Sequence, residues 1–270
     1  TRKESSAASD VYKRQILHST RSTMVYLENF FTTTINLNIY LICIIAIIYI
    51  MIHQNRHRQF NQYLDVYLNY IPVLTHEFGH VLFNKISGGR AKDLVIITRP
   101  SERLQTMQQG YAITQSKGLI GQFITTLGGY IMPPLMLLIG LSAAYYGHPS
   151  LFLSAYIIIF IYFLMLTSRK LSPIIVLIIF IALLYFLVQH DNQLLFYYLV
   201  TFIYHLILGV LLGEVLQSSW TIFKLTFQRP IPSWDGRTLT ELTRIPTFLF
   251  STLWIAINIL SIYLMLIFTI

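Results

Sequence analysis

Long runs of apolar residues constrain the fold of this chain more than any other feature. Several are about 18 residues or longer with few charges, which lets a helix cross the roughly 30 Å hydrocarbon core of a bilayer. Of the 270 residues, 55% are hydrophobic and only 11% are charged, whereas soluble domains carry about 25% charged residues. The sequence therefore predicts a polytopic membrane protein and excludes a soluble globule.

The apolar runs predict an all-α fold of about seven transmembrane helices. The expected spans cover residues 35–52, 63–86, 119–146, 151–167, 171–189, 194–216 and 246–270. Two strand-like segments follow the second span, from Asp93 to Thr98 and from Gln109 to Thr114, with a turn expected at 101–103. We therefore expect a small β-hairpin inserted after the second span, at the membrane surface.

The amino-terminal residues 1–23 differ from the rest of the chain. They are polar and show no apolar period, so we exclude them from the fold as a disordered or non-native leader. Residues 24–270 are expected to form a single integral-membrane domain.

The second span contains the segment HEFGH at residues 76–80. A helix advances about 100° per residue, so His76 and His80 project from the same face, one turn apart. Two neutral imidazoles at that spacing can hold one Zn²⁺, and Glu77 can accept a proton from a metal-bound water. Cys43 is the only cysteine, so any zinc must be held by histidine and carboxylate. Two incidental histidines on an apolar helix are the simpler alternative.

Polar residues recur along the second span at spacings that place them on one stripe of a helix. They are Asp65, Asn69, His76, His80 and Asn84. Such a stripe must face protein or water rather than lipid. Pro72 removes one backbone hydrogen bond just ahead of HEFGH, so we expect the helix to kink or restart there.

Basic residues predict how the chain is oriented in the membrane. With the amino terminus inside, the inner loops 87–118, 168–170 and 217–245 hold eleven Lys and Arg, against Arg56 and Arg58 outside. This places the carboxyl end of the HEFGH helix toward the cytoplasm, most simply at the plasma membrane. The net charge of +8 follows from these loops, so we expect no nucleic-acid partner.

Catalytic zinc usually has three protein ligands and one open position, so HEFGH needs a third ligand. The candidates are Asp235, Glu214, His205 and Asp65. Asp235 lies in PIPSWDG, where two prolines stiffen the approach and Gly236 allows a turn, although a helix N-cap is its alternative role. Glu214 ranks second, as a ligand, as a partner of a ligand histidine or as an interfacial residue. We expect His205 to pack between helices and Asp65 to lie too far away.

These motifs resemble the site-2 protease class of intramembrane zinc metalloproteases, in a bacterial and plant-type branch. The resemblance rests on HEFGH in a membrane helix, a Gly-Gly pair at 88–89, the strand segments and PIPSWDG, and it continues through LTELTRIP at 239–246 and Trp254. It covers about residues 62–142 and 215–265, which we take as the catalytic core. The class often has an Asn shortly before its Pro-x-Pro, where this chain reads Phe-Gln-Arg at 227–229.

The resemblance implies one catalytic Zn²⁺ held by His76, His80 and Asp235, with Glu77 as catalytic acid and base. It implies hydrolysis of peptide bonds in membrane-embedded protein substrates near the cytoplasmic face. We expect the two strand segments to hold an extended substrate by edge pairing. Two alternatives are a zinc-binding membrane chaperone or assembly factor without protease activity, and an ion or proton transporter.

Overall fold

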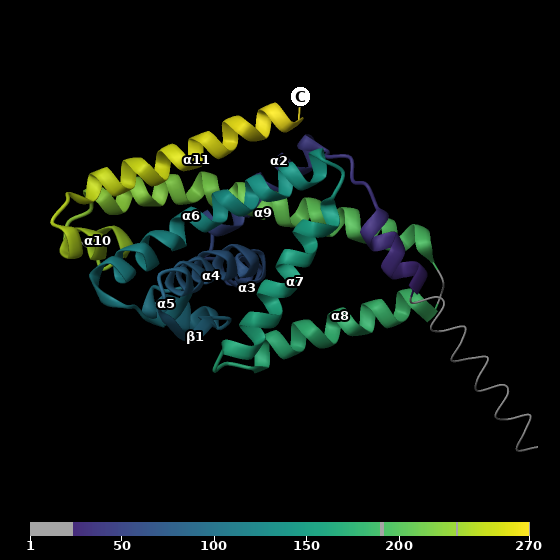
Figure 1. Cartoon of the computed structure of the whole chain (residues 1–270), viewed down its shortest axis with the longest axis horizontal. Coiled ribbons are helices and arrows are strands. Elements are labelled where there is room, and N and C mark those ends of the chain that lie inside the picture. The colour runs from purple at the N-terminus through teal and green to yellow at the C-terminus, as the bar shows by residue number, and fades with distance from the viewer. Residues whose placement is uncertain (1–23, 190–191, 231, 270) are drawn as a thin grey trace, which may run out of the picture.

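The computed structural model describes residues 24–189, 192–230 and 232–269, and it is helical apart from one small sheet (Figure 1). The predicted leader lies outside the described residues. Residues 24–32 are helical. The later elements are α2 (Ile39–Gln54), α3 (Gln59–Leu68), α4 (Tyr70–Ile86), β1 (Arg90–Ile96), α5 (Pro100–Thr106), β2 (Gly110–Gln115), α6 (Gly118–Tyr145), α7 (Pro149–Leu166), α8 (Leu171–Gln189), α9 (Gln193–Phe227), α10 (Asp235–Thr243) and α11 (Thr247–Thr269).

Four helices are long and apolar enough to cross a membrane, namely α6, α7, α9 and α11. Shorter apolar stretches are Ile39–Gln54 in α2 and Leu171–Leu187 in α8. The helical, multi-pass architecture is thus confirmed, whereas a count of seven spans is not. Helix α9 has 35 residues and continues well past the expected span. No Gly or Pro interrupts residues 217–227, and the helix ends as the chain approaches Pro230.

The predicted second span consists of two helices rather than one. Helix α3 ends at Leu68 and α4 starts at Tyr70, with Asn69 between them. Pro72 is the third residue of α4, where a backbone N–H has no partner within the helix, so proline is tolerated there. The expected disturbance at Pro72 is therefore a helix start.

The predicted β-hairpin is present as an antiparallel pair, with Arg90 opposite Gln115 and Ile96 opposite Gly110. Its connection differs from the expected turn at 101–103, because these residues belong to α5. Pro100 occupies the first turn of this helix and Glu102 adds a negative charge near its amino end, both of which favour a helix.

The insertion formed by β1, α5 and β2 is fastened to the loop between α7 and α8. The backbone N–H and the hydroxyl of Ser168 donate to the Asp93 carboxylate, at 2.9 and 2.6 Å. Arg169 forms an ion pair with Glu102 at 2.7 Å, and its hydrogen bond lowers the pKa of the Glu102 carboxyl. The middle helices, which carry no sequence motif, thereby help to hold the insertion.

Helices α2 and α9 pack in parallel through the two glycines of a Gly-x-x-x-Gly sequence. At one end, the Asn38 backbone N–H donates to His205 Nε2 at 2.9 Å. Further along both helices, a Cβ atom at Gly209 would lie 2.5 Å from Ile45, and one at Gly213 would lie 2.5 Å from the Tyr49 ring. The residue numbers rise together on the two helices, so their carboxyl ends lie at the same end of the molecule.

This packing corrects the predicted position of the loop with Arg56 and Arg58. The loop lies at the same end as α10 and the insertion, because α3 and α4 do not together form a crossing helix. In Figure 1 the helical residues 24–32 lie at the opposite end from α10. The eleven basic residues of the inner loops and these two arginines are therefore gathered at one end of the described structure.

We expect Arg58 and α10 to be accessible from the same side of the membrane. In a Cys43→Ala background, which removes the only cysteine, single cysteines would replace the exposed residues Arg58, Arg237 and Asn36. In sealed vesicles of one orientation, an impermeant maleimide should label Arg58→Cys and Arg237→Cys together and spare Asn36→Cys. Labelling of Arg58→Cys together with Asn36→Cys would contradict the parallel packing of α2 and α9.

Candidate active site

The two histidines of HEFGH lie one turn apart on α4, with ring centroids 5.0 Å apart. Asp235, the first residue of α10, joins them across the molecule. Its Oδ2 lies 3.6 Å from His76 Nε2 and 3.4 Å from His80 Nε2. Within the described ranges, these residues form the one group of three or more His, Cys, Asp or Glu side chains that could hold a metal ion.

This donor set fits zinc. Four tetrahedral bonds of about 2.0–2.1 Å place neighbouring ligand atoms about 3.3 Å apart, close to the observed nitrogen–oxygen separations. His80 Nδ1 lies 2.9 Å from the Thr125 carbonyl oxygen, to which its N–H donates. That hydrogen bond orients the ring so that Nε2 faces Asp235, and Nε2 can bind a metal ion when it is unprotonated.

The electrostatic surroundings keep Asp235 ionised. Burial alone would raise the pKa of the Asp235 carboxyl, but His80 and His76 outweigh burial and hold that pKa well below its ordinary value. Asp235 is an acidic residue in the first turn of α10, where a negative charge is favourable. The alternative role of helix N-cap is not confirmed, because the N-cap of α10 is Trp234 and the Asp235 carboxylate faces the two histidines.

Three glycines allow α4 and α6 to approach closely beside the site. A Cβ atom at Gly79 would lie 2.4 Å from the Gly128 carbonyl oxygen, and one at Gly128 would lie 2.6 Å from that of Gly79. A Cβ atom at Gly129 would lie 2.5 Å from His80 Nε2 and 2.7 Å from His76 Nε2. Gly129 therefore leaves space for the ligand nitrogens as well as for the helix contact.

An aromatic cluster holds the segment with Asp235 against α6. The Tyr130 ring lies 4.8 Å from His76, 6.1 Å from Trp234 and 4.7 Å from Trp254, measured between centroids. A Cβ atom at Gly236 would lie 2.5 Å from the Trp234 ring, so a larger residue directly after Asp235 would have to displace that ring. Tyr130 was not predicted as a site residue, and its one signal in the sequence is that it directly follows a glycine pair in α6.

Glu77 lies between the histidines and the hairpin. Its side chain is buried, at 9% exposure, and the Ala112 backbone N–H donates to its carboxylate. A Cβ atom at Gly110 would lie 3.2 Å from Glu77 Cγ, so β2 runs directly past this residue. The start of β2 therefore forms one wall of the site.

A cavity of about 660 Å³ opens over these residues. Its wall includes His76, Glu77 and Tyr130 at the metal cluster and extends to Asp65, Arg103 and Glu214. Asp65 and Glu214 line the same cavity as His76 and Glu77, whereas His205 does not. None of these three candidates belongs to the group formed by His76, His80 and Asp235. Glu214 contacts the Tyr49 hydroxyl, Asp65 pairs with Arg103, and His205 accepts the Asn38 N–H.

The two half-buried histidines with buried Glu77 between them, and the Asp235 carboxylate at the start of α10, are the arrangement expected of a membrane metallopeptidase. The family model described as Peptidase M50B-like matches residues 40–265. The chain belongs to this family of membrane zinc metalloproteases, which confirms the resemblance to site-2 proteases. Comparison with curated proteins and with solved structures found no match.

We expect Asp235 to be required for zinc binding and Glu214 not to be. If the three side chains hold zinc, Asp235→Ala would remove one of three ligands, whereas Glu214→Gln keeps the shape of a side chain outside the cluster. After purification and dialysis, elemental analysis should find about one zinc per wild-type chain and per Glu214→Gln chain, and little in Asp235→Ala. Zinc lost from Glu214→Gln and kept by Asp235→Ala would reverse the assignment.

We also expect Gly129→Ala to lose zinc, because its methyl group would occupy the space of the histidine nitrogens. Gly121→Ala on the same helix is the matched control, since its Cβ would have no neighbour closer than 3.5 Å. Zinc content and folding, followed by size-exclusion chromatography, should be normal in the control. Full zinc occupancy in folded Gly129→Ala would show that the histidines do not hold the ion as described.

Proposed function

We propose that this protein is an intramembrane zinc metalloendopeptidase that hydrolyses peptide bonds of membrane-embedded protein substrates near the cytoplasmic face. The observation that carries the proposal is the meeting of His76, His80 and Asp235 beside buried Glu77. Membership of the M50B-like family supports the same reaction class. The bilayer and a membrane-protein substrate are its expected partners.

Glu77 would act as the general base and then as the general acid. Its carboxylate accepts a proton from the attacking water and passes it to the leaving amine nitrogen. A bound zinc ion would supply Lewis acidity to the scissile carbonyl and to that water. The Thr125 carbonyl fixes the His80 tautomer, and the Gly129 backbone leaves room for the ligand nitrogens.

The substrate must be extended where it is cut, because the carbonyls of an intact helix are already hydrogen-bonded. We propose that the segments from Asp93 to Thr98 and from Gln109 to Thr114 hold the unwound substrate by pairing at a sheet edge. The position of β2 beside Glu77 supports this role.

The gathering of basic residues at one end supports an orientation with that end in the cytoplasm, since cytoplasmic loops are enriched in Lys and Arg. The loop before α10 lies at this end, so the active site would open toward the cytoplasm. A plasma-membrane location is part of the same proposal.

The role of Glu77 also distinguishes a protease from the two alternative functions. A zinc-binding chaperone or assembly factor would work without hydrolysis, and an ion or proton transporter would move charge across the membrane. The meeting of a third ligand with both histidines, and Glu77 beside them, favours a hydrolase.

We expect Glu77→Gln to retain zinc and to lose cleavage of a membrane-embedded reporter by at least about a hundredfold, because general acid–base catalysis contributes roughly 10²–10⁴-fold. The reporter would be a tagged single-span polypeptide incubated with purified protein in detergent, with products identified by mass spectrometry. Glu241→Gln, on the exposed face of α10, is the control and should cleave normally. Cleavage unchanged by Glu77→Gln would contradict the assignment of Glu77 as the catalytic acid and base.

A further inference from the structure

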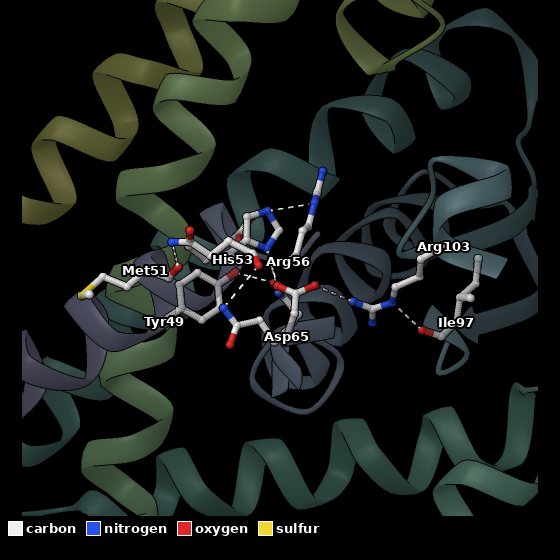
Figure 2. Close-up of polar contacts among 11 residues, drawn as sticks. Tyr49, Met51, His53, Arg56, Asp65, Ile97 and Arg103 are labelled. Atoms are coloured by element: carbon white, nitrogen blue, oxygen red, sulfur yellow. Dashed lines mark hydrogen bonds and ion pairs between the residues drawn. The ribbon is translucent and has the colours of Figure 1, made fainter. Parts of the chain in front are cut away.

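A buried polar network forms the part of the cavity wall away from the metal cluster. Figure 2 shows Asp65 of α3 between His53 of α2 and Arg103 of α5. His53 Nδ1 lies 2.6 Å from Asp65 Oδ1, and Arg103 Nη1 donates to Asp65 Oδ2 at 3.4 Å. Asp65, Arg103 and His53 all line the cavity that contains Glu77.

His53 links Asp65 to a second arginine, Arg56. Arg56 can only donate, so its contact with His53 Nε2 at 3.0 Å makes that nitrogen an acceptor. His53 Nδ1 faces the Asp65 carboxylate at 2.6 Å and the amide nitrogen of Asn69 at 3.0 Å. Two guanidinium groups therefore lie near one carboxylate, because Arg103 pairs with Asp65 directly and Arg56 is linked to it through His53.

Glu214 lies at the other end of this network, in contact with the Tyr49 hydroxyl. Asn69 Nδ2 donates to Asp65 at 2.6 Å, so Asn69 Oδ1 faces the Tyr49 hydroxyl as an acceptor. The Tyr49 hydroxyl lies 2.5 Å from both Asn69 Oδ1 and Glu214 Oε2, and it can donate its one proton to either acceptor. Glu214 therefore belongs to the Tyr49 and Asn69 side of the network, whereas the carboxylate that pairs directly with Arg103 is that of Asp65.

Arg103 has one donor that no described residue accepts. The residue is 9% exposed, and its Nε donates to the Ile97 carbonyl oxygen at 2.7 Å. Its Nη2 is buried without a hydrogen-bond partner among the described residues. An unpaired buried donor on a charged group is unfavourable, and a carboxylate is the acceptor that best fits a guanidinium.

The hairpin relates Arg103 to the reacting bond. Arg103 is held by Ile97, whose N–H donates to the Gln109 carbonyl oxygen at 2.9 Å. Glu77 accepts from Ala112, three residues further along β2, which corresponds to about 10 Å of extended chain. A substrate running past β2 would bring a side chain about two to four residues from the scissile bond to Arg103.

We propose that Arg103, with Arg56 beside it, is a subsite that binds the carboxylate of an acidic substrate side chain about two to four residues from the scissile bond. The proposal rests on the proposed protease function. It makes Arg103 a specificity-determining residue rather than a catalytic one.

The test compares single-span reporters that differ only in Asp or Asn at one position, scanned on both sides of the scissile bond. Binding is measured on zinc-loaded Glu77→Gln protein in nanodiscs, so that it does not depend on cleavage. The Asp reporter should bind about tenfold more tightly than its Asn partner at the matching position, since hydrogen bonds to charged groups are strong. Cleavage by the protein with Glu77 intact should show the same preference.

Arg103→Gln should reduce the Asp-to-Asn ratio to about one while the Asn reporter binds as before, and Arg103→Lys should keep a smaller preference because it keeps the charge. Arg58→Gln, an exposed residue outside the cavity wall, should keep the full ratio. A ratio near one at every position overturns the proposal, as does a ratio that Arg103→Gln does not change. Binding that follows anionic lipid content but not Asp would assign Arg103 to a headgroup and also overturn it. If no reporter is cleaved, the protease function fails, while the binding ratio still tests the subsite.

Discussion

The close contact between α4 and α6 is the interaction on which the rest of the structure depends. Without side chains at Gly79 and Gly128, the two backbones approach until each carbonyl lies against the other helix. This approach brings the Thr125 carbonyl to His80 and the Tyr130 ring to His76. Tyr130 then supports Trp234, and the segment with Asp235 completes the cluster.

The polar side chains of the core follow the rule that such groups in a membrane protein must be paired or face water. One hydrogen-bonded network joins α2, α3 and α9. In it, Tyr49 and His53 of α2 contact the polar side chains of Asp65, Asn69 and Glu214. His76 and Glu77 of the candidate metal site line the same cavity as His53, Asp65 and Glu214 of this network. Catalysis and substrate choice can therefore be assigned to different residues of one site.

Local motifs predicted much of this arrangement, because HEFGH and PIPSWDG carry their geometry in a few neighbouring residues. The hairpin was also predictable, because turn-forming residues flank each of its two strand-like segments. The direction of α2 was not, because it depends on whether residues 63–86 cross the membrane, and the break at Asn69 is stabilised by Tyr49 and Asp65 from outside α4. Tyr130 and Arg103 were missed for the same reason, as their partners are distant in sequence.

The central claim is that His76, His80 and Asp235 hold one zinc ion beside Glu77. X-ray absorption spectroscopy at the zinc edge of the purified protein tests it most directly. We expect a shell of nitrogen and oxygen ligands about 2.0–2.1 Å from the zinc ion, together with the outer-shell signal of two imidazoles. A spectrum with sulfur ligands, or with the imidazole signal of one histidine or none, would contradict it.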